Sequence, residues 1–540
     1  MRVMLAGLVA VVMAGTSVLS WQNVRASDIA PRFHWPDETT NAYFAARIAR
    51  GESFVVPEPR NRDVGNIIHP RTMNVRPDGA LVPGSYLGLP LWYGLVGRAT
   101  DPRVMGLLTP LLAGGALWAL ARLVARVAGA AVAAWAVVLV ALHPSWWLFT
   151  ATAFLPNVPF LSLLLMGGAV VVSRVRPFDR NGDEKHTSSG KELVRWGVGG
   201  LLVGIALTMR THEALWVAGL LTLMVWWQRP SWYAVVAGMG GVLLPFLPIL
   251  VLQQQLYGSP FTTGYALLQE GGALPTEFVR TAVPIPGILQ ALIAPFGWHP
   301  IAALSRAWHY LVQPYPWFAL LACAGGVMVW PRHRRAVLGT LVMMAWLLLM
   351  YGSWELADPL VRATNMLTIS YTRYWLPIIM LLAPWAAYGC VRIFGALAPY
   401  VRPYAGALLV GSIALMTMTK MVRDDAEGLL RQMTTLDDHR TRARTVLAAT
   451  EPDAVVLSDR MDKVFFPERA VVQATPARGR DPVFRDHLRA LIDRAPVYWY
   501  APDGYASGSE WREMGFRTIA VSGGASGAEE LYRMGHAPES

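Results

Sequence analysis

Charged side chains are scarce in this 540-residue chain, where Asp, Glu, Lys and Arg make up 15 % of the residues. Soluble domains carry roughly 25 %. Only two cysteines occur, Cys323 and Cys390, and both fall inside long apolar runs, which argues against a disulfide framework or a zinc site. No basic patch with interleaved aromatics accompanies the net charge of +11, so nucleic acid is not an indicated partner. Apolar residues make up 54 % of the chain, which indicates an integral membrane protein.

Long apolar runs recur through the first four-fifths of the chain, at the length that a helix needs to cross a hydrocarbon core. Tryptophans near the ends of these runs are typical of an interfacial aromatic belt. The hydropathy pattern predicts a polytopic α-helical protein with about eleven spans. They fall near residues 3–20, 103–121, 127–142, 153–173, 196–209, 213–228, 231–252, 312–331, 336–352, 374–395 and 404–421.

Short basic loops set the expected orientation, because such loops stay in the cytoplasm. They all lie on one side of the membrane if the N-terminus is cytoplasmic, and they occur at 122–126, 174–195, 229, 332–335 and 402. The longer segments 21–102, 253–311 and 353–373 and the C-terminal tail then lie outside. A cleaved signal peptide is the alternative to an N-terminal anchor, with Val24-Arg25-Ala26 as a poor cleavage site. With either interpretation the protein lies in a cell membrane and its first loop lies outside the cytoplasm.

The tail from residue 422 to 540 differs in composition, with frequent charges and short apolar runs. A basic helix is expected over 437–449, and strands over 454–459, 497–500 and 518–521. The sequence therefore predicts a membrane module over 1–421 and a small extracytoplasmic α/β domain over 422–540. A structural lid without chemistry of its own is the plain interpretation of that domain.

The first outside loop contains an acidic pair, Asp37–Glu38, directly after Trp35-Pro36. Asp37 stands where a helix is expected to begin, so a helix cap with a first-turn acid explains the pair without any function. At a membrane surface, however, a carboxylate can also take a proton from an acceptor hydroxyl or hold a divalent cation against a phosphate.

This pair, opening a helix in the first outside loop of a chain with about eleven spans and an outside C-terminal domain, resembles the GT-C glycosyltransferases. The resemblance is strongest to the protein O-mannosyltransferase and lipid A aminoarabinose transferase branch. It implies transfer of a sugar from a polyprenyl-phosphate carrier to an acceptor outside the cytoplasm, with Asp37 as catalytic base and Glu38 beside it. Asn157, in Pro156-Asn157-Val158-Pro159, stands where the family commonly has an aspartate, which puts a second acid and metal binding in doubt.

Further polar residues are expected on the same side of the membrane. Arg210, His212 and Glu213 lie between two spans, and Arg210 with Glu213 is either a structural pair or part of a phosphate site. Tyr371 and Arg373 enter a late span in an Arg-Tyr-x-x-Pro pattern that resembles the family's; Arg373 is either an interface anchor or a phosphate ligand.

His69 and Arg71 in the first loop are candidates for binding phosphate or acceptor, with solvated loop residues as the simpler interpretation. No Ser–His–Asp, Cys–His or phosphate-loop arrangement competes with this assignment, and an inverting transfer needs no covalent intermediate. The expected partners are a polyprenyl-phosphate-linked sugar, membrane lipid and an acceptor protein, lipid or glycan. No cofactor is indicated beyond a divalent cation, which stays open. A transporter or flippase of lipid-linked saccharides and a non-catalytic membrane scaffold are the rival functions.

Overall fold

A computed structural model describes residues 2–24, 28–172, 189–271, 297–354, 370–423, 428–501, 508–523 and 530–537. The chain divides into two compact units. The helical unit contains residues 1–20, 107–249 and 273–432, and the sheet unit contains 21–106, 250–272 and 433–540. Most of the predicted basic loop 174–195, from residue 174 to 188, lies outside the described residues.

The helical unit is built from long apolar helices, which satisfy their own backbone hydrogen bonds as a membrane requires. In chain order its helices, of which α1, α4 and α11 extend into the sheet unit, are α1 (Arg2–Val24), α4 (Met105–Ala128), α5 (Ala130–Ala141), α6 (Pro144–Ala151), α7 (Asn157–Val171), α8 (Ser189–Met209), α9 (Ala214–Gln228), α10 (Trp232–Leu243), α11 (Phe246–Tyr257), α14 (Pro300–Ala307), α15 (Pro316–Gly352), α16 (Leu376–Gly395) and α17 (Arg402–Arg423). Short turns of 3-10 or π helix connect several of them, as η3 (Thr211–Glu213), η5 (Trp308–Val312) and η6 (Ser370–Trp375). The predicted spans overlap these helices without matching them one to one. The predicted span 231–252 is divided between α10 and α11, and the predicted spans 312–331 and 336–352 both fall largely on α15.

Six helical stretches of the described chain are long and apolar enough to cross a membrane, by length and composition. They are Pro102–Ala128, Gly190–Met209, Trp232–Tyr257, His333–Gly352, Tyr371–Gly395 and Arg402–Met421. The number rises to eight if each of two bent helix pairs is one span: α5 with α6, bent by 61°, and Pro300–Val312 with Pro316–Pro331, bent by 106°. The chain is therefore a multi-pass membrane protein. The count of eleven spans and the side on which each terminus lies stay predictions.

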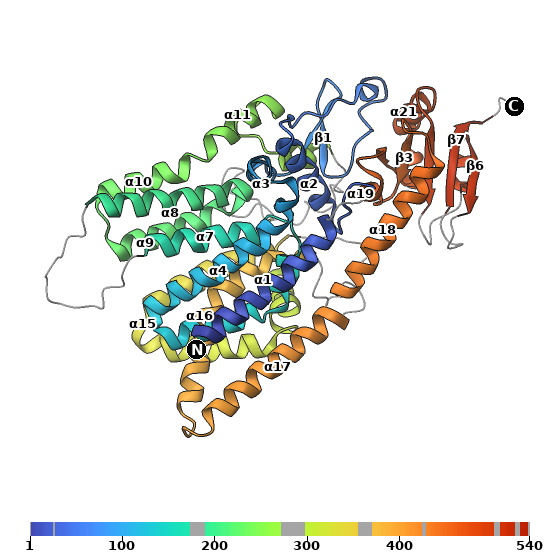
Figure 1. Cartoon of the computed structure of the whole chain (residues 1–540). Helices are drawn as coiled ribbons and strands as arrows, with labels where there is room; N and C mark the ends of the chain where they lie inside the picture. The colour runs from blue at the N-terminus through green and yellow to red at the C-terminus, as the bar shows by residue number, and fades with distance from the viewer. Residues whose placement is uncertain are drawn as a thin grey trace. The chain divides into compact units, whose positions relative to one another are not determined.

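Glycines let neighbouring helices of this unit approach closely, as is common where helices pack in a membrane. A Cβ at Gly325 of α15 would lie 1.8 Å from the carbonyl oxygen of Trp385 in α16. A Cβ at Gly200 of α8 would lie 2.1 Å from the carbonyl oxygen of Gly238 in α10. In Figure 1, α8 lies between α7 and α10, and it packs against both. These contacts rule out larger residues at both glycines without a shift of the backbone.

The sheet unit combines the first loop with the C-terminal tail. The loop supplies α2 (Pro36–Ala49), η1 (Pro59–Asp63), β1 (Met73–Val75), β2 (Leu81–Pro83), α3 (Gly88–Ala99) and η2 (Pro102–Val104), and α12 (Gly264–Gly271) joins them. The tail supplies α18 (Leu429–Ala449), β3 (Val455–Ser458), α19 (Asp462–Phe465), β4 (Ala470–Gln473), α20 (Pro476–Gly479), α21 (Pro482–Ile492), β5 (Val497–Ala501), α22 (Ser509–Glu513), β6 (Phe516–Gly523) and β7 (Glu530–His536). The expected helix and the three expected strands of the tail are confirmed, whereas β4 and β7 were not predicted.

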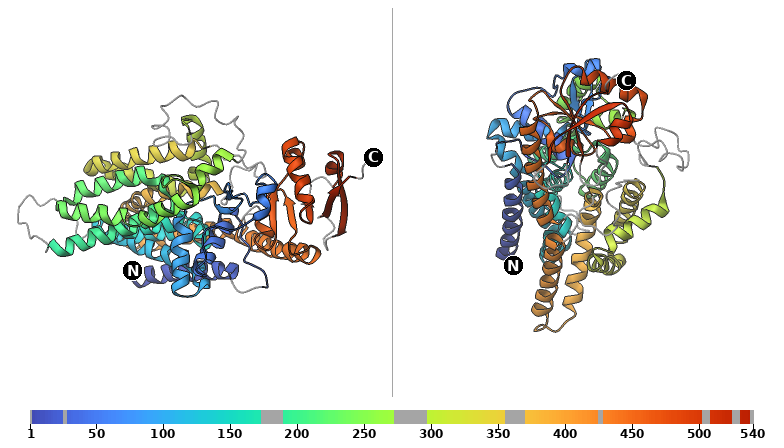
Figure 2. Two further views of the ribbon diagram at one scale, coloured as in Figure 1. Left: turned by 90° about the horizontal axis from the view of Figure 1, so that it is seen from above. Right: turned by 90° about the vertical axis from the view of Figure 1, so that its right-hand side faces the viewer.

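The five tail strands form one mixed sheet in the order β4-β3-β5-β7-β6, drawn as orange to red arrows in Figures 1 and 2. β3 pairs in parallel with β4 and β5, while β7 runs antiparallel to β5 and β6. The first loop continues this sheet, because Ile68 forms an isolated bridge with Val472 of β4. Val64, Ile67 and Ile68 of the loop belong to the same buried apolar core as the tail strands. The division at residue 421/422 into membrane module and separate tail domain stays a prediction.

Candidate functional site

The acidic pair lies at the start of α2 in the sheet unit. The helix begins at Pro36, and its capping residue is Trp35, two positions before Asp37. The expectation that Asp37 is the cap is therefore wrong, because proline is well suited to the first helical position. Glu38 is buried, and its carboxylate accepts a hydrogen bond of 3.3 Å from the backbone N–H of Trp35. Asp37 is half-buried in the first turn, where the helix dipole favours a carboxylate.

His69 and Arg71, also in the sheet unit, contact the tail. The Arg71 guanidinium binds Asp462 with Nε 3.0 Å and Nη2 2.9 Å from Oδ1, and its backbone N–H donates to Oδ2 at 2.8 Å. Nη2 also donates to the carbonyl of Arg460 at 2.9 Å. Nδ1 of His69 lies 2.9 Å from the carbonyl of Pro70. Arg71 thus holds the first loop on the tail, and its role toward phosphate or acceptor stays a prediction.

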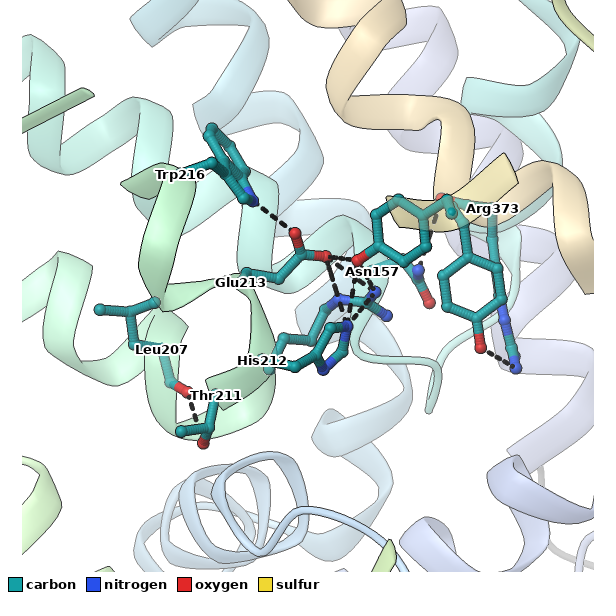
Figure 3. Close-up of polar contacts among 10 residues, drawn as sticks. Asn157, Leu207, Thr211, His212, Glu213, Trp216 and Arg373 are labelled. Carbon is teal, nitrogen blue, oxygen red and sulfur yellow. Dashed lines mark hydrogen bonds and ion pairs between the residues drawn. The ribbon is translucent and has the colours of Figure 1, made fainter. Parts of the chain in front are cut away.

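Arg210, His212 and Glu213 meet around the hydroxyl of a tyrosine in the helical unit (Figure 3). Arg210 Nε lies 2.9 Å from Glu213 Oε1, and Nη2 donates to the hydroxyl of Tyr351 at 2.8 Å. The Tyr351 hydroxyl in turn donates to Glu213, and Trp216 donates its indole N–H to the other carboxylate oxygen. Arg210 and Glu213 are 4 % and 1 % exposed, so the charges need these partners.

His212 lies at the edge of this network. Its Nε2 is 3.0 Å from Arg210 Nη2 and 3.0 Å from the Tyr351 hydroxyl. Since arginine can only donate, Nε2 accepts from it, which places the imidazole proton on Nδ1. The sequence interpretation of Arg210 and Glu213 as a structural pair describes this geometry; it leaves room for Arg210 to act on a ligand as well, because a guanidinium has five N–H donors.

Tyr374 connects this network with Arg373. The guanidinium carbons of Arg210 and Arg373 each lie 5.1 Å from the centroid of the Tyr374 ring, within cation–π range. Arg373 Nη2 also donates to the Tyr374 hydroxyl at 3.1 Å. The Tyr374 ring stacks on Tyr351, with centroids 5.2 Å apart. One aromatic ring therefore brings together two arginines that are 163 positions apart in the sequence.

Asn157 and Tyr371 contact the backbone of the same region. Asn157 Nδ2 donates to the carbonyl of Arg373 at 3.4 Å, and its buried Oδ1 has no hydrogen-bond partner among the described residues. An ionised aspartate could not make the first contact, because it has no donor. The hydroxyl of Tyr371 donates to the carbonyl of Tyr351. The geometry thus suits the amide at 157 and gives no support for a second acid there.

The predicted site residues fall into two groups. Asp37, Glu38, His69 and Arg71 belong to the sheet unit; the helical unit brings together a second group, Asn157, Arg210, His212, Glu213, Tyr371 and Arg373. Sequence reasoning missed Tyr351 and gave no role to Tyr374, the tyrosine of the Arg-Tyr-x-x-Pro pattern. Each ends or begins an apolar run and so resembles an interfacial aromatic. In the described part of the chain no group of three or more His, Cys, Asp or Glu could hold a metal ion.

No protein-family model matches the sequence, and no curated protein matches it. Among solved structures, the chain is similar to ArnT from Cupriavidus metallidurans bound to undecaprenyl phosphate, with 12 % identity over 97 % of both chains and a TM-score of 0.48. It is also similar to the Archaeoglobus fulgidus oligosaccharyltransferase tethered with an acceptor peptide, with 12 % identity over 92 % of this chain and 69 % of that chain and a TM-score of 0.49. Both are GT-C glycosyltransferases, the class that the sequence resembles. With TM-scores below 0.5, these likenesses do not by themselves assign a fold or an activity to this chain.

Proposed function

We propose that this protein is a membrane glycosyltransferase that moves a sugar from a polyprenyl-phosphate donor to an acceptor on the extracytoplasmic side, with inversion at the anomeric carbon. The observation that carries the proposal is the shared Tyr374 ring, which gathers Arg210 and Arg373 in one place. Two guanidinium groups against the single carboxylate of Glu213 leave a formal charge of +1. Such a group suits a phosphate whose charge grows as it leaves the sugar.

In the proposed reaction the acceptor oxygen attacks the anomeric carbon, and the bond from that carbon to the lipid phosphate breaks. Asp37 takes the acceptor's proton as general base. The phosphate leaves with the bonding electrons, so its charge changes from −1 to −2, and Arg210 and Arg373 stabilise that change. Asn157 contributes a buried acceptor, Oδ1, which suits a sugar hydroxyl. The predicted orientation places α2 and these arginines on the same side of the membrane, as the proposal requires.

The test compares Asp37→Asn with Asp78→Asn in membranes supplied with a polyprenyl-phosphate sugar. Asp78 is an acid of the same loop, paired with Arg76 and 39 % exposed, so it controls for loss of a loop carboxylate. Loss of a general base lowers kcat by about 10²–10⁴-fold. Asp37→Asn should show that loss at normal expression while Asp78→Asn retains transfer. Wild-type transfer by Asp37→Asn would refute the assignment of the base.

A transporter or flippase of lipid-linked saccharides is the second candidate, because broken helices are typical of transporter sites. The helix pairs α5–α6 and Pro300–Val312 with Pro316–Pro331 are both bent. His143 is fully buried at the first break, and its ring centroid lies 4.2 Å from that of Tyr315 at the second break. A fluorescent polyprenyl-phosphate lipid in proteoliposomes separates the two functions. Rapid exchange of that lipid between leaflets, unchanged in Asp37→Asn, would favour the flippase.

A further inference from the structure

The short helix α19 of the tail and the residue after it contact the first loop at three points, which lie before and after Asp37 in the sequence. Asp462, its first residue, binds Arg71. Lys463, its second residue, donates from Nζ to the backbone carbonyl of His34. Phe466, directly after the helix, packs edge-on against Tyr43 of α2, with ring centroids 4.7 Å apart. All of these residues belong to the sheet unit.

Two of these contacts lead to the first turn of α2. His34 precedes Pro36, the first residue of the helix, by two positions. Thr72, next to Arg71, donates from its hydroxyl to the carbonyl of Pro36 at 3.1 Å, and it is also 2.6 Å from the hydroxyl of Thr40. The segment before Asp37 is therefore held by Lys463 at His34 and by Thr72 at Pro36. Together these contacts fix where the first turn of α2 begins.

The stability of α2 does not by itself explain a lysine at this position. A helix N-terminus carries a partial positive charge, which the first-turn carboxylates Asp37 and Glu38 already complement, so the helix dipole does not call for a lysine there. Glu38 already satisfies the N–H of Trp35 as a first-turn acid should. Lys463 instead holds the chain just before the helix, by donating a hydrogen bond to the carbonyl oxygen of His34.

We infer that Lys463 of the tail is a positioning residue for Asp37, so that the C-terminal domain takes part in catalysis by holding the first turn of α2. This inference rests on the proposed function, in which Asp37 is the general base. A base must lie within hydrogen-bond reach of the proton that it removes, and a displacement of about 1 Å costs up to about 10²-fold in rate. The tail is then part of the catalytic assembly and more than a lid.

The experiment uses the full-length protein and the variants Lys463→Met, Lys463→Arg and Arg517→Met. Methionine keeps most of the apolar stem and removes the donor, arginine restores a donor, and Arg517 is an exposed cation on β6 that serves as control. Lys463→Met should lower kcat about tenfold or more while KM for the donor changes less than about twofold. Lys463→Arg should recover most of the rate, and Arg517→Met should behave as wild type.

Hydrogen–deuterium exchange supplies a readout that needs no transfer assay. Lys463→Met should speed exchange in a peptide that covers residues 34–40, with wild-type exchange in β5 as evidence that the sheet unit is folded. If Asp37→Asn abolishes transfer but Lys463→Met keeps wild-type kcat, the inference about Lys463 is overturned and the proposed function stands. If Asp37→Asn also transfers normally, Asp37 is not the base and the inference about Lys463 falls with that assignment. If the wild type shows no transfer at all, the proposed function itself fails, and exchange at 34–40 still decides whether Lys463 fixes the helix start.

Discussion

Replacing Arg71 by methionine should open the contact between the first loop and the tail, because it leaves the carboxylate of Asp462 buried without its cation. Asp462 is 1 % exposed on its side chain, whereas Arg71 is 28 % exposed. Breaking a buried pair by removing one partner costs about 3–5 kcal/mol. The backbone N–H of residue 71 still donates to Oδ2 at 2.8 Å, so the low end, about 3 kcal/mol, is the expected loss.

That loss corresponds to about a hundredfold change in an opening equilibrium, at 1.4 kcal/mol for each factor of ten. Hydrogen–deuterium exchange in peptides covering 66–75 and 455–466 measures it directly. Arg494→Met is the matched control, because Arg494 also links the tail to the loop, through Asp63 at 3.3 Å. That pair is 42 % and 57 % exposed, and surface pairs contribute about 0–1 kcal/mol, so exchange should change less than about fivefold.

Equal effects of Arg71→Met and Arg494→Met would refute this reasoning, as would exchange in Arg71→Met within fivefold of wild type. A double variant gives a second check. Adding Asp462→Asn to Arg71→Met removes the charge that the single variant strands, so the double variant should exchange more slowly than Arg71→Met alone. Faster exchange in the double variant would mean that the carboxylate is not the source of the cost.

Two further predictions concern the arginine group and the histidines of the sheet unit. Tyr374→Phe keeps the ring under Arg210 and Arg373, so it should raise KM for the donor only slightly. Tyr374→Leu removes both cation–π contacts, each about 1–2 kcal/mol when desolvated, so it should raise KM tenfold or more. Equal KM values in the two variants would contradict this. Burial, aided by Lys463, lowers the pKa of His34 from 6.5 to about 3, and burial with nearby cations lowers the pKa of His439 to about 2. The unfolded chain therefore binds protons that the folded unit does not, so the free energy of unfolding should fall as pH drops from about 6.5 toward 3. Replacing both histidines by glutamine should weaken this dependence of stability on pH, as measured by thermal unfolding.

Much of the architecture could be predicted from the sequence, because apolar runs of membrane length leave few other structures open. Helix α2 and strands β3 and β5 were also predictable, from Trp35-Pro36 and from runs of Val, Leu, Tyr and Trp. Strand β7 escaped prediction, since its sequence from Glu530 to His536 includes arginine and glycine. Its strand conformation comes from pairing with β5 and β6.

The site was predicted less completely, because its contacts join residues far apart in the chain. Arg210 and Arg373 could be proposed from their positions at the ends of spans, but nothing in the sequence shows that they share the ring of Tyr374. Asp462 and Lys463 read as ordinary turn residues after a strand. They matter because they contact Arg71 and His34, which lie 391 and 429 residues earlier in the chain.

The joint core of the first loop and the tail has a consequence for biosynthesis. Val64, Ile67 and Ile68 belong to the same buried core as strands that begin at Val455. At about 5–20 residues per second, a ribosome needs on the order of half a minute to make the chain between them. In the predicted orientation the loop waits outside the membrane through that interval with its apolar residues uncovered. A chaperone on that side would therefore meet this loop before the tail is made. A chain truncated before β3 would have complete membrane helices but a first loop with no core to join.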